Sequence, residues 1–591
     1  MAPDPAQNLQ TSIPSLSIGN IVTVGLQIFR LHFNDHFVRS LLAHLLIWFA
    51  LIAGMIGVAL VAALAMGLDA GLRLQGFATV IGVVVAVLGI LPFLLFILGR
   101  FTALGGLMTR MGVNTLNRRV EPEELHRQTI LQRPWKYLGA AVLFGLVLLV
   151  AVLACMGVFW ILFVLLLPYW KSWELQLTDP QTDWVLTLGG VLLGLSVILV
   201  LGLVVYYLTA RLWLFDAVLA MEPQYSALTA LQRSWRLTRG KGWSITTVMF
   251  VVTLVTLPFS LLATVLNLFL PIFGLVFAVM TFPLWQAVKA VNYYELAALR
   301  TGLAFDLFVL PPDPRRYLRR VAIQTPEEVE LDFTLGGAGS RALAWITDQV
   351  ILWVLLALLT VAGAFTYAGV LLPILVERLD VPVDKLNLWA AAIASVIGFV
   401  IANGYFIAWE TLWRGQTPGK RLARIRVVRD NGQPIGVKEA TLRSLVGWFD
   451  SGFLFIGAFL IIFSRSEKRL GDLAAGTLVI QSETAGAQDL QVVPAAFDSL
   501  TDDTVEVLLA QPDLQPLSMD HYFVLQNFLG YRSRLSRMDC QSITEKLAQQ
   551  LRTLFMPSSP EQLGTIPDET LVEAAYVLCR SDKAFLRNPM A

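Results

Sequence analysis

Four ionisable residues in the second half of the chain stand inside or beside long apolar runs, where a charge is costly. They are Arg341, Asp348, Asp450 and Asp472. A carboxylate at membrane depth usually faces a bundle interior or a water-filled cavity, and burial and neighbouring charges tune its pKa. Such carboxylates are the usual parts of a proton relay, so this set predicts proton exchange or cation binding.

Asp348 is the residue to which we assign that chemistry. Arg341 stands at the mouth of an apolar run, and Asp348 lies seven residues further in. In a helix this spacing puts both on one face, about 10 Å apart along the axis. We expect Asp348 to exchange a proton or bind a cation, with Arg341 setting its charge state. The structural alternative is an ion pair between Arg341 and Asp472 that joins helices, with Asp348 bonded to a neighbouring span.

A second set of residues could contact lipid headgroups. The segment LQRPWK at 131–136 recurs as LQRSWR at 231–236, and a weaker copy begins at Leu26. Each copy precedes a pair of apolar runs, which predicts an amphipathic helix followed by a helical hairpin, used three times. Trp favours the membrane interface and Arg contacts phosphates. The candidate headgroup contacts are Arg133, Trp135, Arg233 and Trp235. Simple anchoring at the interface is the alternative, and it is the more general role of such residues.

Other chemistry is not predicted. His32, Asp35, His36 and His44 share a helix face, but a metal site needs three or four converging ligands and a second shell, so we expect an interfacial helix instead. The three cysteines have neither zinc nor disulfide spacing. No nucleophile–base pair or cofactor motif is present, so we predict no enzyme and no cofactor. With 44 Lys+Arg against 43 Asp+Glu, the charge balance also excludes a nucleic-acid binder driven by bulk charge.

Long uncharged runs must position these residues. The chain is 56% apolar and 15% charged, against about 25% charged in soluble domains. A spanning helix needs roughly 20 apolar residues. Longer runs cover Ser40–Leu68, Leu74–Gly99, Tyr137–Trp170, Trp184–Ala210, Gln349–Val376 and Leu386–Trp409, and Trp243–Val288 is long enough for two helices with a turn near Asn267 and Pro271. This predicts an all-α polytopic membrane protein with six spans before about Arg300 and two after it.

The loops between the runs alternate in charge. Basic residues cluster after the second, fourth and sixth runs, whereas the opposite loops are poor in Lys and Arg. Basic loops stay on the cytoplasmic side. The N-terminus, which lacks the pattern of a signal peptide, and the central linker are therefore expected in the cytoplasm.

The basic loop 414–443 contains a sequence that resembles a phosphate loop. In Gly415–Lys420 only three residues separate the glycines, and Arg421 stands where Ser or Thr is needed, so nucleotide binding is not predicted. Arg424–Val428 and Pro434–Val437 flank Asp430-Asn431-Gly432, which is a good turn signal. We expect a small cytoplasmic β-hairpin with a basic rim.

The apolar segment Ser444–Phe463 is interrupted at Asp450, Ser451 and Gly452 and has basic residues on both sides. The uncharged part after Asp450 is too short to span comfortably. A broken, re-entrant helix pair satisfies both observations and keeps the C-terminus in the cytoplasm. The alternative is a ninth span, which would put the C-terminus outside.

Several of these motifs occur in the order found in a known family. Arg341, Asp348, the Gly415–Arg421 loop and Asp472 in Leu-Gly-Asp-x-x-Ala-Gly-Thr resemble the RDD family over about residues 320–482. The resemblance implies an integral membrane protein, for which transport and in some members cation–proton exchange have been suggested. It also implies partners such as MoxR-type ATPases and membrane proteins like sporulation stage II protein M.

The first half resembles a different group. The Leu-Gln-Arg-x-Trp segments and Tyr293–Leu296 are similar to the membrane-anchoring region of some glycerophosphodiester phosphodiesterases, over about residues 15–310. The catalytic domain of those enzymes is missing, so the resemblance implies no such activity here.

The expected organisation follows from these patterns. It comprises a disordered N-terminus (1–16), a six-span membrane domain (17–300), a cytoplasmic linker (301–340), a membrane domain of two spans and a re-entrant pair (341–482), and a cytoplasmic helical domain (483–591). In that last domain Asp539 is expected to cap a helix carrying Ile543, Leu547 and Leu551. We predict a transport-related protein of a bacterial inner membrane that contacts membrane lipids. The alternative is a membrane scaffold that docks partners through its C-terminal domain.

Overall fold

A computed structural model describes thirteen segments of the chain. They are residues 16–72, 77–117, 130–174, 183–270, 272–300, 314–324, 330–379, 382–452, 456–464, 466–482, 519–532, 537–555 and 566–580. The chain divides into two compact units. We call Ile28–Phe250 with Gly274–Arg300 the hairpin unit, and Met1–Gln27 with Val251–Phe273 and Thr301–Ala591 the network unit.

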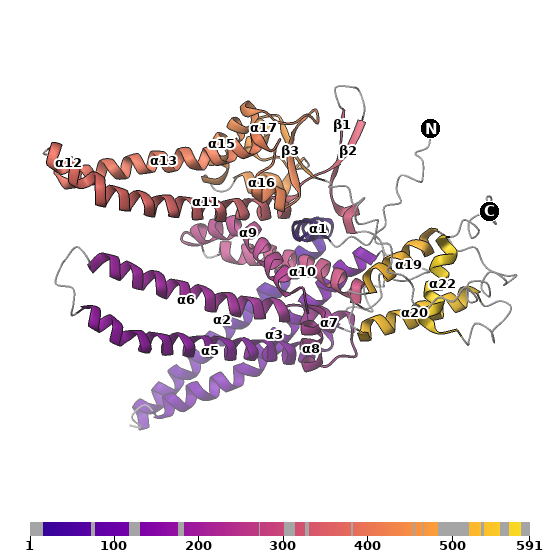
Figure 1. Ribbon diagram of the computed structural model, residues 1–591. Coiled ribbons are helices and arrows are strands. Elements are labelled where there is room, and N and C mark those ends of the chain that lie inside the picture. The colour runs from indigo at the N-terminus through magenta and orange to yellow at the C-terminus, as the bar shows by residue number, and fades with distance from the viewer. Residues whose placement is uncertain are drawn as a thin grey trace. The chain divides into compact units, whose positions relative to one another are not determined.

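Long apolar helices dominate both units (Figure 1). They are α2 (Phe33–Leu72), α3 (Phe77–Asn117), α5 (Pro134–Glu174), α6 (Asp183–Leu212), α9 (Gly242–Asn267), α10 (Ile272–Arg300), α11 (Ala338–Thr366) and α13 (Val383–Leu412). Within the described residues, eight helical segments are long and apolar enough to cross a membrane. The predicted count of spans is confirmed, as is the helix end at Asn267, while Pro271 lies outside the described residues.

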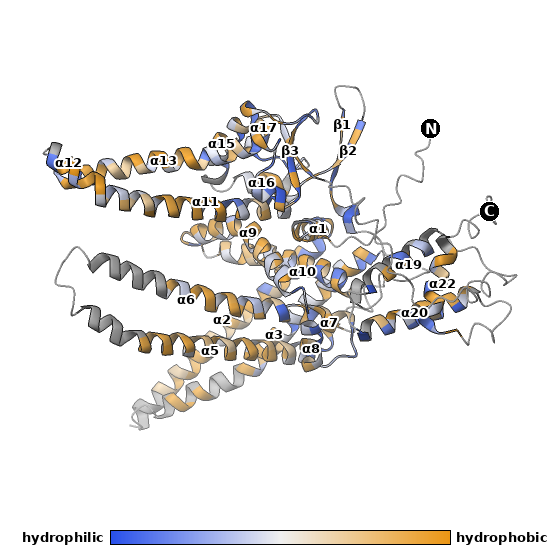
Figure 2. Cartoon of the chain, in the orientation of Figure 1, coloured by the Kyte–Doolittle hydropathy of each residue, from blue (hydrophilic) through white to orange (hydrophobic). Residues whose placement is uncertain are grey.

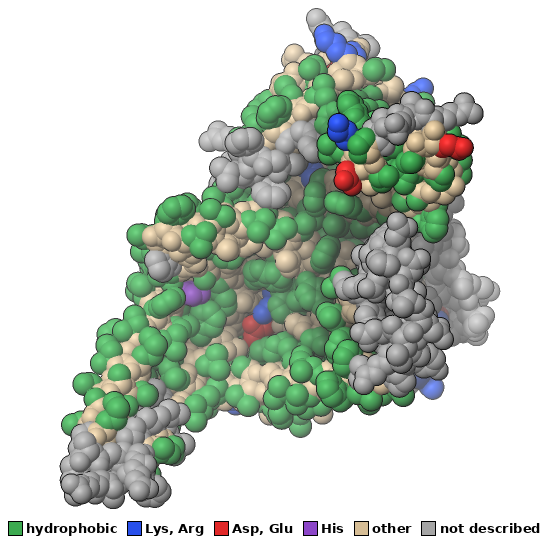
Figure 3. Space-filling model, turned by 90° about the vertical axis from the view of Figure 1, so that its left-hand side faces the viewer, with side chains coloured by type: hydrophobic (Ala, Val, Ile, Leu, Met, Phe, Trp, Pro, Cys, Tyr) green, Lys and Arg blue, Asp and Glu red, His purple; other side chains and the backbone are tan. Residues whose placement is uncertain are grey.

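The long helices expose apolar side chains instead of burying them. Figure 2 shows hydrophobic residues along most of α2, α5, α11 and α13, and hydrophobic side chains dominate the face in Figure 3. Leu199 and Phe365 are 73% and 78% exposed. Apolar patches of this extent are not tolerated on a monomer in water. The chain is therefore an all-α multi-pass membrane protein whose helices meet lipid.

Short helices precede the helical hairpins of the first half. They are α1 (Ile18–Leu31), α7 (Phe215–Met221) and α8 (Ala227–Leu237). α8 buries Ala230, Leu231 and Leu237 and exposes Trp235, so the predicted amphipathic helix exists in that copy of the repeat. In the middle copy residues 118–129 lie outside the described residues, and Trp135 belongs to the first turn of α5 itself.

The predicted hairpin of the basic loop is wrong in its pairing. β3 (Ile425–Arg429) pairs antiparallel with β4 (Thr477–Gln481), in the register Ile425↔Gln481, and meets the segment after the Asn431-Gly432 turn only through a bridge from Val428 to Pro434. β4 is buried at four of its five positions, so β3 gains more apolar contact from this distant strand than from its neighbour.

A second small sheet lies in the segment expected to be a linker. β1 (Arg320–Gln324) and β2 (Glu330–Thr334) form an antiparallel pair with Ile323 opposite Leu331. Buried Ile323 packs in one apolar cluster with Leu335, Val428 and Leu478. The C-terminal part of the predicted linker is therefore structured and continuous with the β3–β4 region.

Two shorter helices cover the segment predicted to be a broken helix pair, but the first of them continues through Asp450, Ser451 and Gly452. These helices are α15 (Val437–Gly452) and α16 (Ile456–Phe463), and neither is long enough to count as a span. Residues 453–455 between them lie outside the described residues. The short helix α17 (Leu470–Ala474) packs against α15 and α16, whereas another short helix, α14 (Pro418–Leu422), packs against α11. α11 continues through a π-helical turn (Tyr367–Leu371) into α12 (Leu372–Leu379) before α13 returns.

The tail holds three helices with a core of their own. They are α19 (Met519–Tyr531), α20 (Arg537–Phe555) and α22 (Asp568–Arg580). Leu525, Phe528, Leu547 and Leu571 are almost completely buried in this core. The predicted helical domain is confirmed, although α20 begins at Arg537, so Asp539 lies inside the helix and does not cap it.

Candidate functional site

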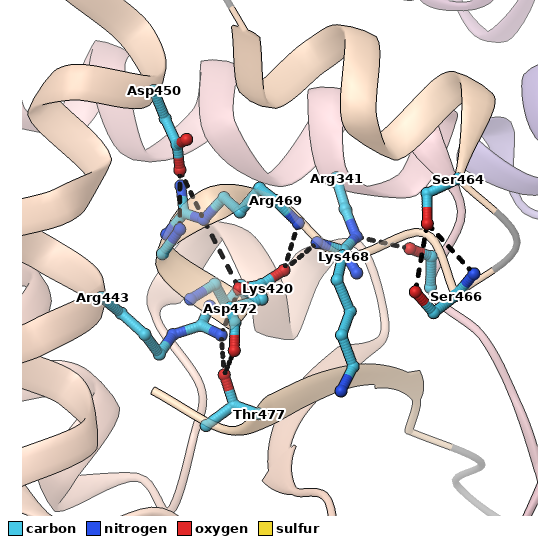
Figure 4. A network of polar contacts seen from close by, with 12 residues as sticks. Arg341, Lys420, Arg443, Asp450, Ser464, Ser466, Lys468, Arg469, Asp472 and Thr477 are labelled. Carbon is cyan, nitrogen blue, oxygen red and sulfur yellow. Dashed lines mark hydrogen bonds and ion pairs between the residues drawn. The ribbon is translucent and has the colours of Figure 1, made fainter. Parts of the chain in front are cut away.

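Asp472 lies at the centre of a buried network of charges in the network unit. Its carboxylate accepts hydrogen bonds from Arg341 Nη1 on α11 at 2.6 Å and from Arg443 Nη1 on α15 at 2.5 Å. The Nε atom of Arg469 lies 3.5 Å away. Figure 4 shows these three guanidinium groups around the carboxylate. One fully buried acid therefore joins three segments that are far apart in the sequence.

The local fold of α17 explains why an aspartate stands at this point. Asp472 is the third residue of the helix, and its Oδ2 accepts a hydrogen bond from the backbone N–H of Arg469, the N-cap residue, at 3.2 Å. An acid in the first helical turn also interacts favourably with the helix dipole. The preceding Gly471 donates its N–H to Asp450 Oδ2 at 3.0 Å, which ties α17 to α15.

Glu410 is a second buried acid that sequence reasoning missed. It lies near the end of α13, is hydrogen-bonded by Lys420 Nζ, and has Arg443 Nε 3.3 Å from its Oε2. Arg443 thus bridges Glu410 and Asp472 and also donates to Thr477 Oγ1 at 2.8 Å. The sequence does contain a pattern that could have identified Glu410, because this acid directly follows an apolar run and precedes a basic loop.

The three guanidinium groups determine the ionisation of Asp472. Burial alone would raise its pKa, but Arg443, Arg341 and Arg469 outweigh burial and hold the pKa well below its ordinary value. Burial would lower the pKa of Arg443, yet Asp472 and Glu410 raise it above its usual range. Burial lowers the pKa of Lys420, and Glu410 opposes that shift only in part.

Asp348 does not pair with Arg341, contrary to the expected control of its charge. Arg341 is engaged by Asp472 and by the carbonyl of Gly336, to which its Nε donates at 2.8 Å. Asp348 is buried, and its two carboxylate oxygens accept three hydrogen bonds, from Tyr405 Oη at 3.0 Å, Thr417 Oγ1 at 2.5 Å and Gly419 N at 2.8 Å. The arrangement matches the structural alternative, with an Arg341–Asp472 ion pair and Asp348 bonded to the neighbouring span α13.

The glycine-rich loop before α14 is built to meet Asp348. Thr417 caps α14 by accepting from Lys420 N, and Pro418 occupies the first helical position. A Cβ on Gly419 would come 2.1 Å from the carbonyl oxygen of Ala344, so only glycine allows α14 to approach α11 this closely. At this close approach, the backbone N–H of Gly419 donates a hydrogen bond to the carboxylate of Asp348.

Asp450 is the acid with unused hydrogen-bonding capacity. It is 3% exposed, and its Oδ2 accepts from Gly471 while Arg469 Nε lies 4.0 Å away. Its Oδ1 is buried without a hydrogen-bond partner among the described residues. Buried polar atoms in native proteins rarely lack a partner, so this oxygen is a site where a ligand, ion or water is expected.

A cavity of about 700 Å³ brings these acids together. Its lining includes the ionisable residues Arg341, Asp348, Glu410 and Asp450. It also includes apolar residues of α9, α11, α13 and α16, such as Pro258, Trp353 and Phe399. A mostly apolar lining with a few polar groups is typical of small-ligand sites. Of the four residues proposed from sequence, Arg341, Asp450 and Asp472 belong to the network of charges. Asp348 has only uncharged partners, but it lines this cavity together with Arg341 and Asp450.

The candidate headgroup residues are not equivalent. Trp135 is 61% exposed and Arg133 is also exposed. Arg233, by contrast, has its Nε 3.4 Å from Glu222, and Trp235 stacks on the guanidinium of Arg211 at 3.9 Å. The copy of the motif at residues 231–236 therefore has partners within the protein.

The histidines near the first span have separate environments. His32 hydrogen-bonds Thr115 at 2.9 Å, and His44 contacts the carbonyl of Ser40 at 2.8 Å. His36 is buried with its ring edge-to-face against His32. Among the residues that the structure describes, no group of three or more His, Cys, Asp or Glu side chains could hold a metal ion.

Comparison with known proteins finds a family that matches the part of the chain containing the network. Residues 335–476 match the model of the RDD family. The uncharacterized protein YckC of Bacillus subtilis (strain 168) is 35% identical over 91 residues, which is 15% of this chain and 60% of that protein. The chain thus spans less than two thirds of this relative's length. No solved structure matches the chain. The resemblance of the first half to phosphodiesterase anchors is not supported by these comparisons.

Proposed function

We propose, from the premise that residues 335–476 are an RDD family domain in a multi-pass membrane protein, that this domain moves a small cation or polar solute. The observation that carries the proposal is the cavity of about 700 Å³, which is lined by ionisable groups and by residues of spanning helices. The protein would act without covalent chemistry and without a cofactor.

Two carboxylates have different roles in this proposal. Asp348 already accepts three hydrogen bonds and positions α14 against α11 and α13. Asp450 has one oxygen without a hydrogen-bond partner among the described residues, and it lies in the last turn of α15. Asp450 is therefore the group that we assign to binding the cation or exchanging the proton, with Asp348 shaping the site.

Flux through the purified protein in proteoliposomes tests the proposal. An imposed Na⁺ or K⁺ gradient should drive proton movement that a pH-sensitive dye reports, and Asp450→Asn should reduce the rate at least ten-fold. Asp430→Asn is the matched control because Asp430 is half-exposed and pairs only with Lys468 in the described structure. If Asp450→Asn and Asp348→Asn both fold correctly and both show unchanged flux, the proposed transport mechanism is refuted.

The separate core of α19, α20 and α22 favours one second function, a scaffold that docks partners through the C-terminal domain. MoxR-type ATPases are the partner class that the family suggests. Pull-downs with the full chain and with a chain lacking residues 483–591 distinguish the two functions. The same set of partners in both experiments would show that the tail is not a docking module.

The proposed location is the inner membrane of a bacterium, with both termini in the cytoplasm. The support is the clustering of basic residues in alternate loops and the broken α15–α16 pair, which need not cross the bilayer. Accessibility of single cysteines introduced near residues 20 and 500 to a membrane-impermeant thiol reagent tests this orientation. Labelling of either from the periplasmic side would contradict it.

A further inference from the structure

A small pocket in the hairpin unit lies at the start of α5. Its lining includes Arg110 on α3, Arg133 just before α5, Lys136 and Tyr137 in the first turn of α5, and Tyr225. The enclosed space is about 20 Å³, enough for one buried ligand oxygen, and the pocket is open on one side. Three cationic side chains therefore surround an opening that a larger anion could enter in part.

Tyr137 is the observation that points to a ligand. Its side chain is buried, with 3% of the residue exposed, and its hydroxyl has no hydrogen-bond partner among the described residues. Leaving a buried hydroxyl unsatisfied costs about 1–3 kcal/mol, and native proteins rarely do so. An acceptor is therefore expected in the pocket that Tyr137 lines.

Two acids of neighbouring described segments, Asp216 and Glu222, are engaged by other residues. Asp216 is held by Lys289 at 2.7 Å, and Glu222 is held by Arg233 and by the hydroxyl of Tyr293 at 2.9 Å. In the described part of the chain, neither Arg133 nor Lys136 forms an ion pair with an acid. The positive end of the dipole of the long helix α5 adds to this field.

We infer that this pocket binds the phosphate of an anionic lipid headgroup. The Tyr137 hydroxyl would donate to one phosphate oxygen in the pocket, and Arg133 and Lys136 would pair with the oxygens at its mouth. Two features favour a lipid as the source of the phosphate. The indole of Trp135 is exposed beside the pocket, and α5 continues from it as a span with exposed Leu146 and Leu149 along which acyl chains can lie.

Binding of lipid to the full-length protein in neutral detergent tests the inference. Native mass spectrometry and thermal unfolding are measured with phosphatidylglycerol, with phosphatidylcholine and with inorganic phosphate. We expect phosphatidylglycerol to bind and to raise the unfolding temperature. Tyr137→Phe and Lys136→Gln should each weaken it by about ten-fold or more, because hydrogen bonds to a charged group are strong.

The controls separate loss of binding from loss of folding. Lys241→Gln removes an exposed cation of the same unit outside the pocket and should bind lipid normally. Without lipid, Tyr137→Phe should unfold at the wild-type temperature or above it, since it removes an unsatisfied hydroxyl. Equal binding by wild type, Tyr137→Phe and Lys136→Gln would overturn the inference, as would destabilisation of lipid-free Tyr137→Phe. If inorganic phosphate stabilises the protein in a way that depends on Tyr137, and phosphatidylglycerol does not stabilise it, the assignment to lipid is overturned.

Discussion

Asp472 shows how a single carboxylate holds distant segments together when several cations share it. Each guanidinium loses its hydration on burial, and the attraction to Asp472 offsets that cost only while the whole set is present. Arg443 has the corresponding role among the cations, because it contacts two acids, Asp472 and Glu410. The network is therefore sensitive to the removal of any one central member.

Removing the charge of Asp472 tests this dependence. Asp472→Asn leaves Arg341 and Arg443 buried beside a neutral amide, and it should destabilise the protein by about 3–5 kcal/mol. Denaturant unfolding in detergent micelles measures the loss. Asp430→Asn, which breaks the exposed pair with Lys468, should cost about 1 kcal/mol or less. Similar losses in the two variants would contradict the central role of Asp472.

The lowered pKa of Asp472 gives stability a defined dependence on pH. A carboxyl whose pKa is lower in the folded than in the unfolded state stabilises fully above its unfolded pKa of about 3.9. This contribution is lost as the pH falls toward the folded pKa. From about pH 5 to about pH 2, the wild type should lose more stability than Asp472→Asn. Parallel curves of unfolding temperature against pH for the two proteins would refute the assignment.

The contact of α14 with α11 decides the geometry around Asp348 at the level of elements. Thr417 and Gly419 reach the Asp348 carboxylate from α14, and Tyr405 reaches it from α13. A short helix of five residues has no stability alone, so its position depends on these bonds and on close packing. One carboxylate thereby orders three elements.

Enlarging Gly419 tests that close packing. The added Cβ of Gly419→Ala would lie 2.1 Å from the carbonyl oxygen of Ala344, so α14 must move and the bond to Asp348 must lengthen. We expect a loss of about 1–3 kcal/mol in thermal or denaturant unfolding. Gly404→Ala, on an open face of α13, should be neutral or slightly stabilising. An unchanged Gly419→Ala protein would show that α14 does not need this approach.

At the scale of the whole molecule, the described chain contains both lipid-facing helices and a separate helical core in the tail. Leu547 is completely buried between α19, α20 and α22. We expect a fragment of residues 515–585 to fold by itself and to unfold cooperatively by circular dichroism. Leu547→Ala should cost about 2–5 kcal/mol, while Gln541→Ala on the exposed face should change stability by no more than about 0.5 kcal/mol. A fragment without cooperative unfolding would contradict its autonomy.

The spans, the helix break near Asp450 and the tail helices were all predictable from the sequence. These features depend on local composition and periodicity, since a run of apolar residues favours lipid whatever its neighbours are. The RDD signature residues were also visible, because their types and order are linear features.

The partners of the charged residues were decided only by the tertiary structure. The pairing of β3 with β4 and the approach of Lys420 and Arg443 to Glu410 join segments that the sequence leaves unrelated. Ion pairs act within a few ångströms, and which acid meets which base depends on packing along the whole chain. By itself, the sequence therefore determined which parts of this protein enter the membrane. Only the folded chain decided that Asp348 is bonded on both oxygens, and that Asp450 Oδ1 and the Tyr137 hydroxyl are buried without a hydrogen-bond partner among the described residues.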